Sequence, residues 1–311
     1  MRIVFLGSGS FAIPCLEALL DAGHEVAALV TQPDREKGRG RPLAPPPTKP
    51  VAERRGIPVL QPRRVREPQA QEELRRLAPE LQVVVAFGQI LPRSVIDIAP
   101  RGTVNVHASL LPRLRGAAPV QWAIANGETE TGVTTMLIDE GLDTGPTLLS
   151  RATPIGPEET AADLEPRLAR LGAELLLETV RGLEDDTVTP RPQDHGRATL
   201  APLLKKEDGR IDWSLPAARI ACRARGFHPW PGAFTFHEGR LLKALRVREA
   251  PAVGAGAAAG TVVDVGADGV TVACGGGSAV RLVEVQPESR RAMPAAAWAA
   301  GARLRPGARL G

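Results

Sequence analysis

The order of hydrophobic and polar positions predicts alternating strands and helices in the first part of the chain. Residues 2–6 form a short apolar run that ends in Gly7-Ser8-Gly9-Ser10, and the apolar positions of residues 13–20 then recur at helical spacing. A second apolar run covers residues 25–31. A strand, a helix and a strand within about 30 residues make a βαβ unit, which predicts parallel strands and a right-handed crossover.

The same alternation continues further along the chain. Residues 81–87 are almost all apolar, as in a strand that is buried on both faces, and residues 103–107 are a further strand. Helical spacing covers residues 117–126 and 159–181. The pattern therefore predicts an α/β fold, a Rossmann-like parallel sheet with helices packed against it.

The pattern changes in the last third of the chain. Residues 185–206 are polar and contain several prolines, which is typical of an interdomain linker. Short alternating strands separated by glycine-rich turns then follow at residues 233–237, 241–248, 260–265, 269–274 and 279–285. They predict a small antiparallel, OB-like β-barrel. We expect a catalytic domain at 1–189, a linker at 190–207 and the barrel domain at 208–311.

Composition narrows the class of protein. A chain of 311 residues predicts about two domains, and 43% hydrophobic with 24% charged residues excludes disorder as its main state. No apolar run reaches the roughly 18 residues that span a bilayer, and the N-terminal run has no cleavage site, so we expect a cytoplasmic protein. Three widely separated cysteines predict neither a disulfide framework nor a metal site.

The small net charge of +4 is unevenly placed along the chain. Ten basic residues lie between Arg35 and Arg66, against Glu36 and Glu53 alone. A local excess of this kind indicates a polyanionic partner. A compositional preference for arginine is the alternative, although it explains arginine in place of lysine and does not explain the clustering.

The first turn of the chain matches a dinucleotide-binding fingerprint only in part. Gly7, Gly9 and Ala12 have the required spacing between a strand and a helix. The fingerprint also needs an acid at the end of the second strand, where residues 30–32 are Val, Thr and Gln, and the first acid is Asp34. Nicotinamide binding is therefore not favoured. The glycines allow a tight turn whose helix N-terminus can receive part of an anionic ligand.

The densest group of polar residues follows the strand at 103–107. Asn105 and His107 are two positions apart and share one face at its carboxyl end, where open α/β sheets bind ligands. Residues 139–145 place two acids in a glycine-bounded loop after another strand. Amide, imidazole and carboxylate together can stabilise an oxyanion and move a proton. From spacing alone, a capping Asn, a core His and a loop-turning Asp fit equally well.

Several segments resemble one family closely. Asn105-x-His107 is followed by SLLP at 109–112, RGAAPVQWAI at 115–124 and GLDTG at 141–145. Together with TQPDREKGRGR at 31–41, VVVAFGQILP at 83–92, KKEDGRIDW at 205–213 and FHPWPGAF at 227–234, they resemble the folate-dependent formyltransferases. The resemblance runs from Met1 to about Arg291. It is closest to the branch whose acceptor is initiator tRNA charged with methionine.

This resemblance implies a reaction and a catalytic triad. The donor is 10-formyltetrahydrofolate, the acceptor is the α-amino group of methionyl-initiator tRNA, and no metal is required. Asn105 and His107 would donate hydrogen bonds to the oxyanion of a tetrahedral intermediate. Asp143 would orient His107 and help to move the amine proton toward N10 of the departing folate.

The resemblance also implies binding residues and a monomeric protein. The turn Ser109, Leu110, Leu111 and Pro112 resembles the family's folate-contact segment. A folate also needs an apolar slot with polar rims, for which we expect one wall from Phe87, Gly88, Ile90 and Leu91 and polar contacts from the backbone of Ile138 to Leu142. The basic loop would approach the acceptor end of the tRNA through Arg35, Lys37, Arg39 and Arg41. A Pro-rich stretch at 42–50 departs from the family's pattern and leaves the individual tRNA contacts of the loop open.

Other functions remain as alternatives. A formyltransferase acting on an amino sugar nucleotide would share Asn105, His107 and the SLLP turn, but it should lack the basic loop and carry a different downstream domain. A related hydrolase would release formate from the same folate. A non-catalytic nucleic-acid-binding protein is opposed by the presence of all three triad residues, Asn105, His107 and Asp143.

Overall fold

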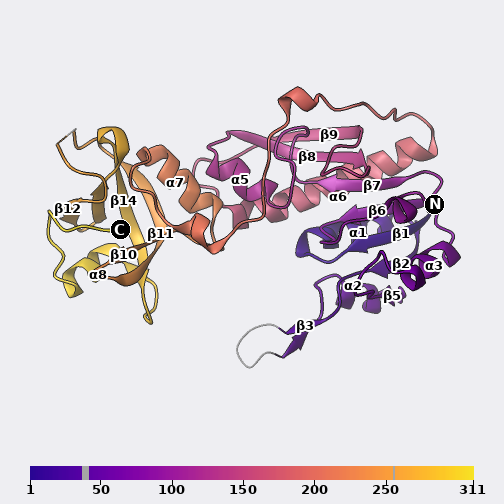
Figure 1. Ribbon diagram of the computed structural model, residues 1–311, viewed down its shortest axis with the longest axis horizontal. Coiled ribbons are helices and arrows are strands. Elements are labelled where there is room, and N and C mark those ends of the chain that lie inside the picture. Colours follow the sequence, from indigo (N-terminus) through magenta and orange to yellow (C-terminus); the bar gives the residue numbers. More distant parts are fainter. Residues whose placement is uncertain (37–41, 255) are drawn as a thin grey trace. The chain divides into compact units, whose positions relative to one another are not determined.

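The computed structural model describes residues 1–36, 42–254 and 256–311, and this part of the chain divides into two compact units. The first unit contains Met1–Ala117, Thr131–Thr153 and Glu165–Ala201, and the second contains Ala118–Glu130, Pro154–Leu164 and Pro202–Gly311. Figure 1 labels the elements. Among the helices of the described residues, none has the length and apolar character needed to cross a membrane.

An α/β sheet forms the first unit, as predicted. Its strand order among the described residues is β5-β2-β1-β6-β7-β8-β9 (Figure 1). The strands are β1 (Arg2–Gly7), β2 (Glu25–Val30), β5 (Val59–Leu60), β6 (Leu81–Val85), β7 (Thr103–His107), β8 (Glu130–Leu137) and β9 (Thr147–Pro154). The pairs from β5 to β7 are parallel, whereas β8 runs antiparallel to β7. Hydrophobic patterning sets the buried face of a strand but not its direction, so the sequence predicted only the parallel part.

The long helix α6 (Ala161–Glu184) covers one face of this sheet. From Gly172, α6 closely approaches the side chains of Val106 and Val133, and its Thr179 hydroxyl lies 2.8 Å from that of Thr135. Successive strand residues point to opposite faces, so Asn105 and His107, which neighbour Val106, point away from α6. Among the described residues, the other α-helices of this unit are α1 (Ile13–Asp21), α2 (Lys49–Arg54), α3 (Pro68–Arg76) and α4 (Arg93–Ile96).

The glycine-containing turn after β1 ties the carboxyl ends of three strands together. Backbone N–H groups of Ser8 and Gly9 donate to the carbonyl of Ala86, just beyond β6. The Ser8 hydroxyl donates to the Phe87 carbonyl at 3.2 Å and accepts from the Gln32 N–H at 3.0 Å. These two amides are therefore used within the protein, and they are not available to a phosphate.

The root of the basic loop is built from a small hairpin and a polar cluster. The strands β3 (Arg35–Glu36) and β4 (Leu43–Ala44) pair antiparallel. Beside them, Lys49 Nζ lies 3.0 Å from an Asp34 oxygen, and Gln61 Nε2 donates to the same carboxylate at 2.7 Å. The hydrogen bonds from Gln61 and Lys49 hold the pKa of Asp34 below its usual value.

The second unit contains the predicted antiparallel sheet. Its strand order among the described residues is β10-β11-β14-β13-β12, and β15 (Met293–Pro294) pairs with β14. The main strands are β10 (Phe234–His237), β11 (Arg240–Ala250), β12 (Val262–Gly266), β13 (Gly269–Ala273) and β14 (Ala279–Pro287). Each lies within a few residues of a strand that the sequence predicted.

Residues 307–311 connect the two edges of this sheet. Leu310 N donates to the carbonyl of Gly260, beside β12, and Gly311 N donates to Phe236 of β10. Thr261 and Arg309 form an isolated antiparallel bridge. The end of the chain thus links the two edge strands β10 and β12, a pairing that the sequence did not predict.

Two helices of the second unit were also not predicted, α7 (Ala217–Gly226) and α8 (Ala295–Gly301). Helix α7 holds the earlier segments that belong to this unit: Arg219 donates to the Asn126 carbonyl at 2.6 Å, and Arg225 donates to that of Glu159 at 2.9 Å. At Gly226, α7 lies so close to α5 (Pro119–Ala125) that a Cβ atom would lie 2.6 Å from backbone atoms of α5. Only glycine permits that approach.

Candidate active site

Asn105 is placed at the centre of the candidate site by β7. It is in register with Val84 of β6 and Met136 of β8. Its side chain is half-buried and has no hydrogen-bond partner among the described residues. A half-buried amide with both donors unused is suited to bind an oxygen atom of a ligand.

His107 lies at the carboxyl end of β7 with its ring buried. The Nε2 atom is 2.9 Å from the Leu114 carbonyl oxygen. A carbonyl oxygen only accepts hydrogen bonds, so Nε2 carries a hydrogen in this arrangement. The Nδ1 atom is therefore the ring atom that remains to bind or release a proton.

Asp143 faces the Nδ1 atom of His107. Its Oδ2 lies 3.7 Å from Nδ1, which is an ion-pair distance and longer than a hydrogen bond. The same oxygen accepts a hydrogen bond of 2.8 Å from the backbone N–H of Gly116. The structure thus brings together His107 and Asp143, two of the three catalytic residues that the sequence predicted, at the end of the strand that carries Asn105.

The turn at residues 109–112 is hydrogen-bonded to β8. Ser109 is fully buried, and its hydroxyl donates to the Arg113 carbonyl at 2.6 Å. The Thr134 hydroxyl donates to Ser109 O at 2.7 Å and accepts from Leu111 N at 3.1 Å. Ser109 therefore uses its hydroxyl to shape the turn, whereas Leu110, Leu111 and Pro112 are half-buried at its surface.

The other residues predicted to contact folate divide into buried and exposed ones. Phe87 and Leu91 are buried in the core of the first unit, and Ile138 packs against the same core. Ile90 and Leu142 are instead 92% and 62% exposed. Gly88 has a left-handed backbone, with φ of +78°. Ile90 and Leu142 are therefore the two apolar side chains of this set that are open to a ligand.

The predicted tRNA-binding loop is described at its base only. Arg35 is exposed, and its guanidinium donates to Gln32 Oε1 at 2.9 Å. Gln32 in turn donates to the Phe87 carbonyl at 3.1 Å. Lys37, Arg39 and Arg41 lie outside the described residues.

Two residues of the site were not predicted from the sequence, Arg115 and Gln193. Both are buried, and the Gln193 side chain donates to the carbonyl oxygens of Asp143 and Gly145. Arg115 is the first residue of the motif RGAAPVQWAI, and its place in that motif could have identified it as a site residue. Gln193 lies in the polar, proline-containing stretch that reads as a linker, so no local pattern marks it.

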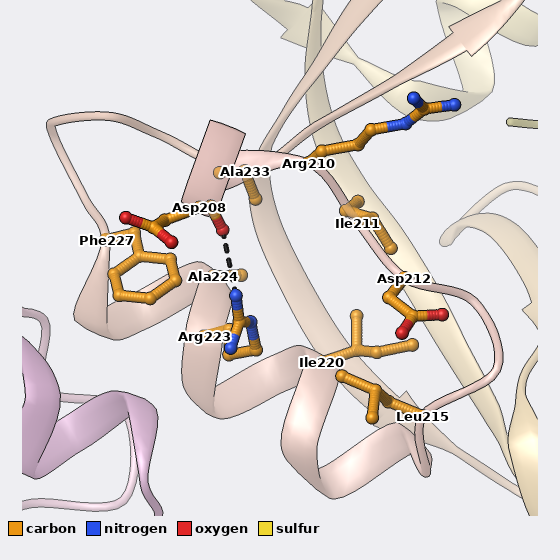
Figure 2. A pocket seen from close by; sticks show the side chains of 11 residues that line it. Asp208, Arg210, Ile211, Asp212, Leu215, Ile220, Arg223, Ala224, Phe227 and Ala233 are labelled. Atoms are coloured by element: carbon orange, nitrogen blue, oxygen red, sulfur yellow. Dashed lines mark hydrogen bonds between the residues drawn. The ribbon is translucent and has the colours of Figure 1, made fainter. Parts of the chain in front are cut away.

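A pocket in the second unit is lined by residues of 208–233 (Figure 2). Arg223 donates to the Asp208 carbonyl at 3.1 Å and lies over the Phe227 ring at 5.0 Å. Asp212 accepts from Ser214, and the Asp208 carboxylate accepts from Lys205 N. These polar groups have partners within the unit: Arg223 joins the last turn of α7 to Asp208, and the other bonds stabilise the loops that precede α7.

The fold and the site define a formyltransferase. A model of the formyl transferase family matches residues 1–180, and a model of the formyl transferase C-terminal domain matches residues 203–303. The chain therefore belongs to the formyl transferase family.

Relatives within this family bear a more specific name. The chain is 52% identical over 311 residues to the methionyl-tRNA formyltransferase of Geobacter sulfurreducens, covering all of this chain and 97% of that protein. It is 54% identical over 311 residues to the methionyl-tRNA formyltransferase of Solibacter usitatus, covering 99% of that protein.

Among solved structures, an N-formyltransferase from Helicobacter canadensis in complex with folinic acid and dTDP-3-aminofucose has the same fold. Its TM-score is 0.69 at 17% identity, with 92% of this chain and 98% of that chain covered.

Proposed function

We propose that this chain transfers the formyl group of 10-formyltetrahydrofolate to the free α-amino group of methionyl-initiator tRNA. The observation that carries the proposal is identity of about one half over the full chain with methionyl-tRNA formyltransferases, in a protein that also holds Asn105, His107 and Asp143 at one site. The products are N-formylmethionyl-tRNA, used in translation initiation, and tetrahydrofolate.

The reaction begins with attack of the neutral amine on the formyl carbon. A free α-amine has a pKa of about 7.7–8, and esterification of the carboxyl group lowers it, so the neutral amine is available near pH 7. Attack forms the new C–N bond and converts the formyl oxygen into an oxyanion. The unpartnered amide of Asn105 donates a hydrogen bond to that oxygen.

His107 donates to the oxyanion from its Nδ1 atom, because Nε2 is already committed to the Leu114 carbonyl. That role requires the protonated ring, whose charge the carboxylate of Asp143 balances from 3.7 Å. The amine proton passes through Asp143, directly or by way of a water molecule, to N10 of the folate. The C–N10 bond then breaks, and tetrahydrofolate leaves.

The substrates are assigned to two regions of the chain. The folate contacts the turn at 109–112, the exposed side chains of Ile90 and Leu142, and backbone groups near Ile138. The basic loop from Arg35 to Arg41 contacts the acceptor end of the tRNA. Chemistry and folate binding belong to residues 1–189, and the barrel at 208–311 binds the tRNA together with the basic loop, in a cytoplasmic monomer.

The alternative acceptor is an amino sugar nucleotide. An enzyme for that acceptor shares the Asn–His–Asp arrangement, so the site alone does not separate the two. The basic loop favours tRNA, because basic side chains bind a polyanion by neutralising its phosphates. The downstream domain does not separate the two acceptors, since the solved N-formyltransferase in complex with dTDP-3-aminofucose matches 92% of this chain. A protein without catalytic activity is not favoured, because the chain contains all three triad residues, Asn105, His107 and Asp143.

An acceptor panel tests the proposal. The protein is incubated with 10-formyltetrahydrofolate and, separately, with methionyl-initiator tRNA, methionyl-elongator tRNA or dTDP-linked 3-amino sugar, and formylated product is measured by mass spectrometry. We expect formylmethionine after ester hydrolysis of the initiator tRNA. Transfer to the amino sugar in place of the tRNA would reject the proposal.

A further inference from the structure

The side chain of Gln193 is held by four hydrogen bonds at the candidate site, and it is only 8% exposed. Its Nε2 donates to the carbonyl oxygens of Asp143 at 2.8 Å and Gly145 at 2.7 Å. Its Oε1 accepts from Arg115 Nη2 at 2.7 Å and Nε at 3.2 Å. An amide has two donor hydrogens and two acceptor lone pairs, so this side chain is fully used.

The loop that Gln193 holds has a left-handed backbone at Asp143. Its φ of +51° lies in a region that residues with a side chain adopt infrequently, with Asp among those that adopt it more readily. The direction of its carboxylate toward His107 depends on that backbone conformation. At Gly145, a Cβ atom would overlap the Leu137 carbonyl, so the turn is also closely packed against the end of β8. The hydrogen bonds from Gln193 to the carbonyl oxygens of Asp143 and Gly145 stabilise this conformation.

The same loop also has internal hydrogen bonds, which involve the side chain of Asp139. Asp139 Oδ1 accepts from Gly141 N at 3.0 Å and from the Thr144 hydroxyl at 2.7 Å. The bond from Thr144 spans residues 139–144, so it closes the loop around Asp143. The carbonyls of Asp143 and Gly145 are instead held by Gln193, a residue 50 positions away from Asp143 in the sequence.

Arg115 connects Gln193 to the other catalytic loop. Its guanidinium is buried, with 6% of the residue exposed, and it lies between the two residues that contact the catalytic pair. The preceding carbonyl, of Leu114, contacts His107, and the following N–H, of Gly116, contacts Asp143. A single chain of hydrogen bonds therefore runs from Arg115 through Gln193 to the backbone of Asp143.

We propose that Gln193 is a positioning residue for formyl transfer, which orients the Asp143 carboxylate toward His107 by holding the Asp143 and Gly145 carbonyl oxygens and coupling them to Arg115. This rests on the proposed function. Gln193 does not contact either substrate. It acts through Asp143, so its loss slows the chemical step and leaves substrate binding intact.

The substitution Gln193→Glu separates the contact of Gln193 with Arg115 from its contacts with the carbonyl oxygens of Asp143 and Gly145. A glutamate at 193 retains an acceptor for Arg115 but cannot donate to the two carbonyl oxygens. We expect kcat to fall roughly 10- to 100-fold, as for a small displacement of a catalytic group, with the KM values of both substrates within about twofold. Gln193→Met, which does not bury a carboxylate, serves as the second variant if the first is poorly folded.

Gln71→Glu is the matched control. Gln71 also accepts from an arginine, Arg75, at 3.1 Å and donates to a backbone carbonyl, that of Arg66, at 2.9 Å, on helix α3. The same substitution there should leave kcat unchanged. Circular dichroism and thermal unfolding of all variants establish that the fold is retained.

A double-mutant cycle with Asp143→Asn tests the path of the effect. The rate of formyl transfer is measured under single-turnover conditions with enzyme in excess, because these conditions make the slow rates of such variants measurable. Because Gln193 acts through Asp143, we expect Gln193→Glu to cause less than about a twofold further loss in the Asp143→Asn background. A full additional loss there, an unchanged kcat in both folded Gln193 variants, or a change confined to KM would overturn the inference. Absence of formyl transfer by the unsubstituted protein would instead reject the proposed function.

Discussion

Oδ2 of Asp143 lies 3.7 Å from Nδ1 of His107, on the side of the imidazole ring opposite the nitrogen that contacts the Leu114 carbonyl. The two nitrogens of the ring thus have separate roles. Nε2 fixes the orientation of the ring, and Nδ1 faces the carboxylate. This separation leaves Nδ1 for the role in catalysis that we propose, while the ring remains buried.

Asn105 offers a test in which activity and stability respond differently. Its side chain has no hydrogen-bond partner among the described residues, so Asn105→Ala should leave the thermal midpoint nearly unchanged. Loss of one oxyanion donor should lower kcat by about 10²–10³. Steady-state kinetics and calorimetry on the same preparation check both. A kcat within threefold of the unsubstituted protein would show that this amide does not contact the oxyanion.

The basic loop is tested by its salt dependence. Substituting Arg39 and Arg41 with Ala should raise the KM for tRNA and reduce the salt slope by roughly 0.7–0.9 log units for each phosphate that the variant no longer neutralises. Arg75→Ala with Arg76→Ala is the control, because it removes two exposed arginines from helix α3. If the control variant reduced the salt slope of tRNA binding equally, the reduction would result from the lower net charge of the protein and not from loss of loop contacts.

The root of the loop should contribute to stability in a pH-dependent way. Hydrogen bonds from Gln61 and Lys49 hold the pKa of Asp34 below its usual value, so the stabilisation is present above the ordinary pKa of about 3.9. It is lost as pH falls through the lower pKa of the folded protein. Asp34→Asn should therefore be destabilising at pH 7, and the difference should vanish in strong acid. Urea unfolding of both proteins from pH 7 to pH 2 checks this; a pH-independent difference would contradict it.

Two buried thiols report on the two units separately. Burial raises the pKa of Cys15 to about 12 in the first unit and that of Cys274 to about 11 in the second. Neither should react with iodoacetamide at pH 8 in the native protein, because thiolate is the reactive form. Mass spectrometry of peptides alkylated at increasing urea should show Cys15 and Cys274 reacting as their own units open. Rapid labelling of either residue without urea would show that its unit is not packed as described.

Much of the site could be predicted because its signals are local. Asn105 and His107 stand two positions apart on one strand, and the alternation of strand residues places both on one face. The glycines that bound the loop at 141–145 mark a turn at the end of another strand. Because β8 runs antiparallel to β7, its carboxyl end at Leu137 pairs with Val104 and not with His107. The pairing of His107 with Asp143 therefore does not follow from strand direction, and only the resemblance of the segment at 141–145 to the family implied it.

Gln193 could not be predicted because its contacts are distant in sequence. It meets Asp143 and Arg115 across 50 and 78 positions, respectively. A polar stretch with prolines reads as a linker whether or not its side chains are bonded elsewhere. The same applies to Gly311, whose N–H reaches the Phe236 carbonyl in β10. Hydrogen bonds that join distant segments leave no periodicity in the sequence.

The most direct test of the central claim is formyl transfer to methionyl-initiator tRNA by the unsubstituted protein and by Asp143→Asn. The donor is 10-formyltetrahydrofolate, and formylmethionine is measured after ester hydrolysis, with tRNA affinity measured in parallel. We predict transfer by the unsubstituted protein and a fall in kcat on the order of 10²–10⁴ in Asp143→Asn, with tRNA affinity within a few fold. Transfer by Asp143→Asn at the full rate would contradict the account.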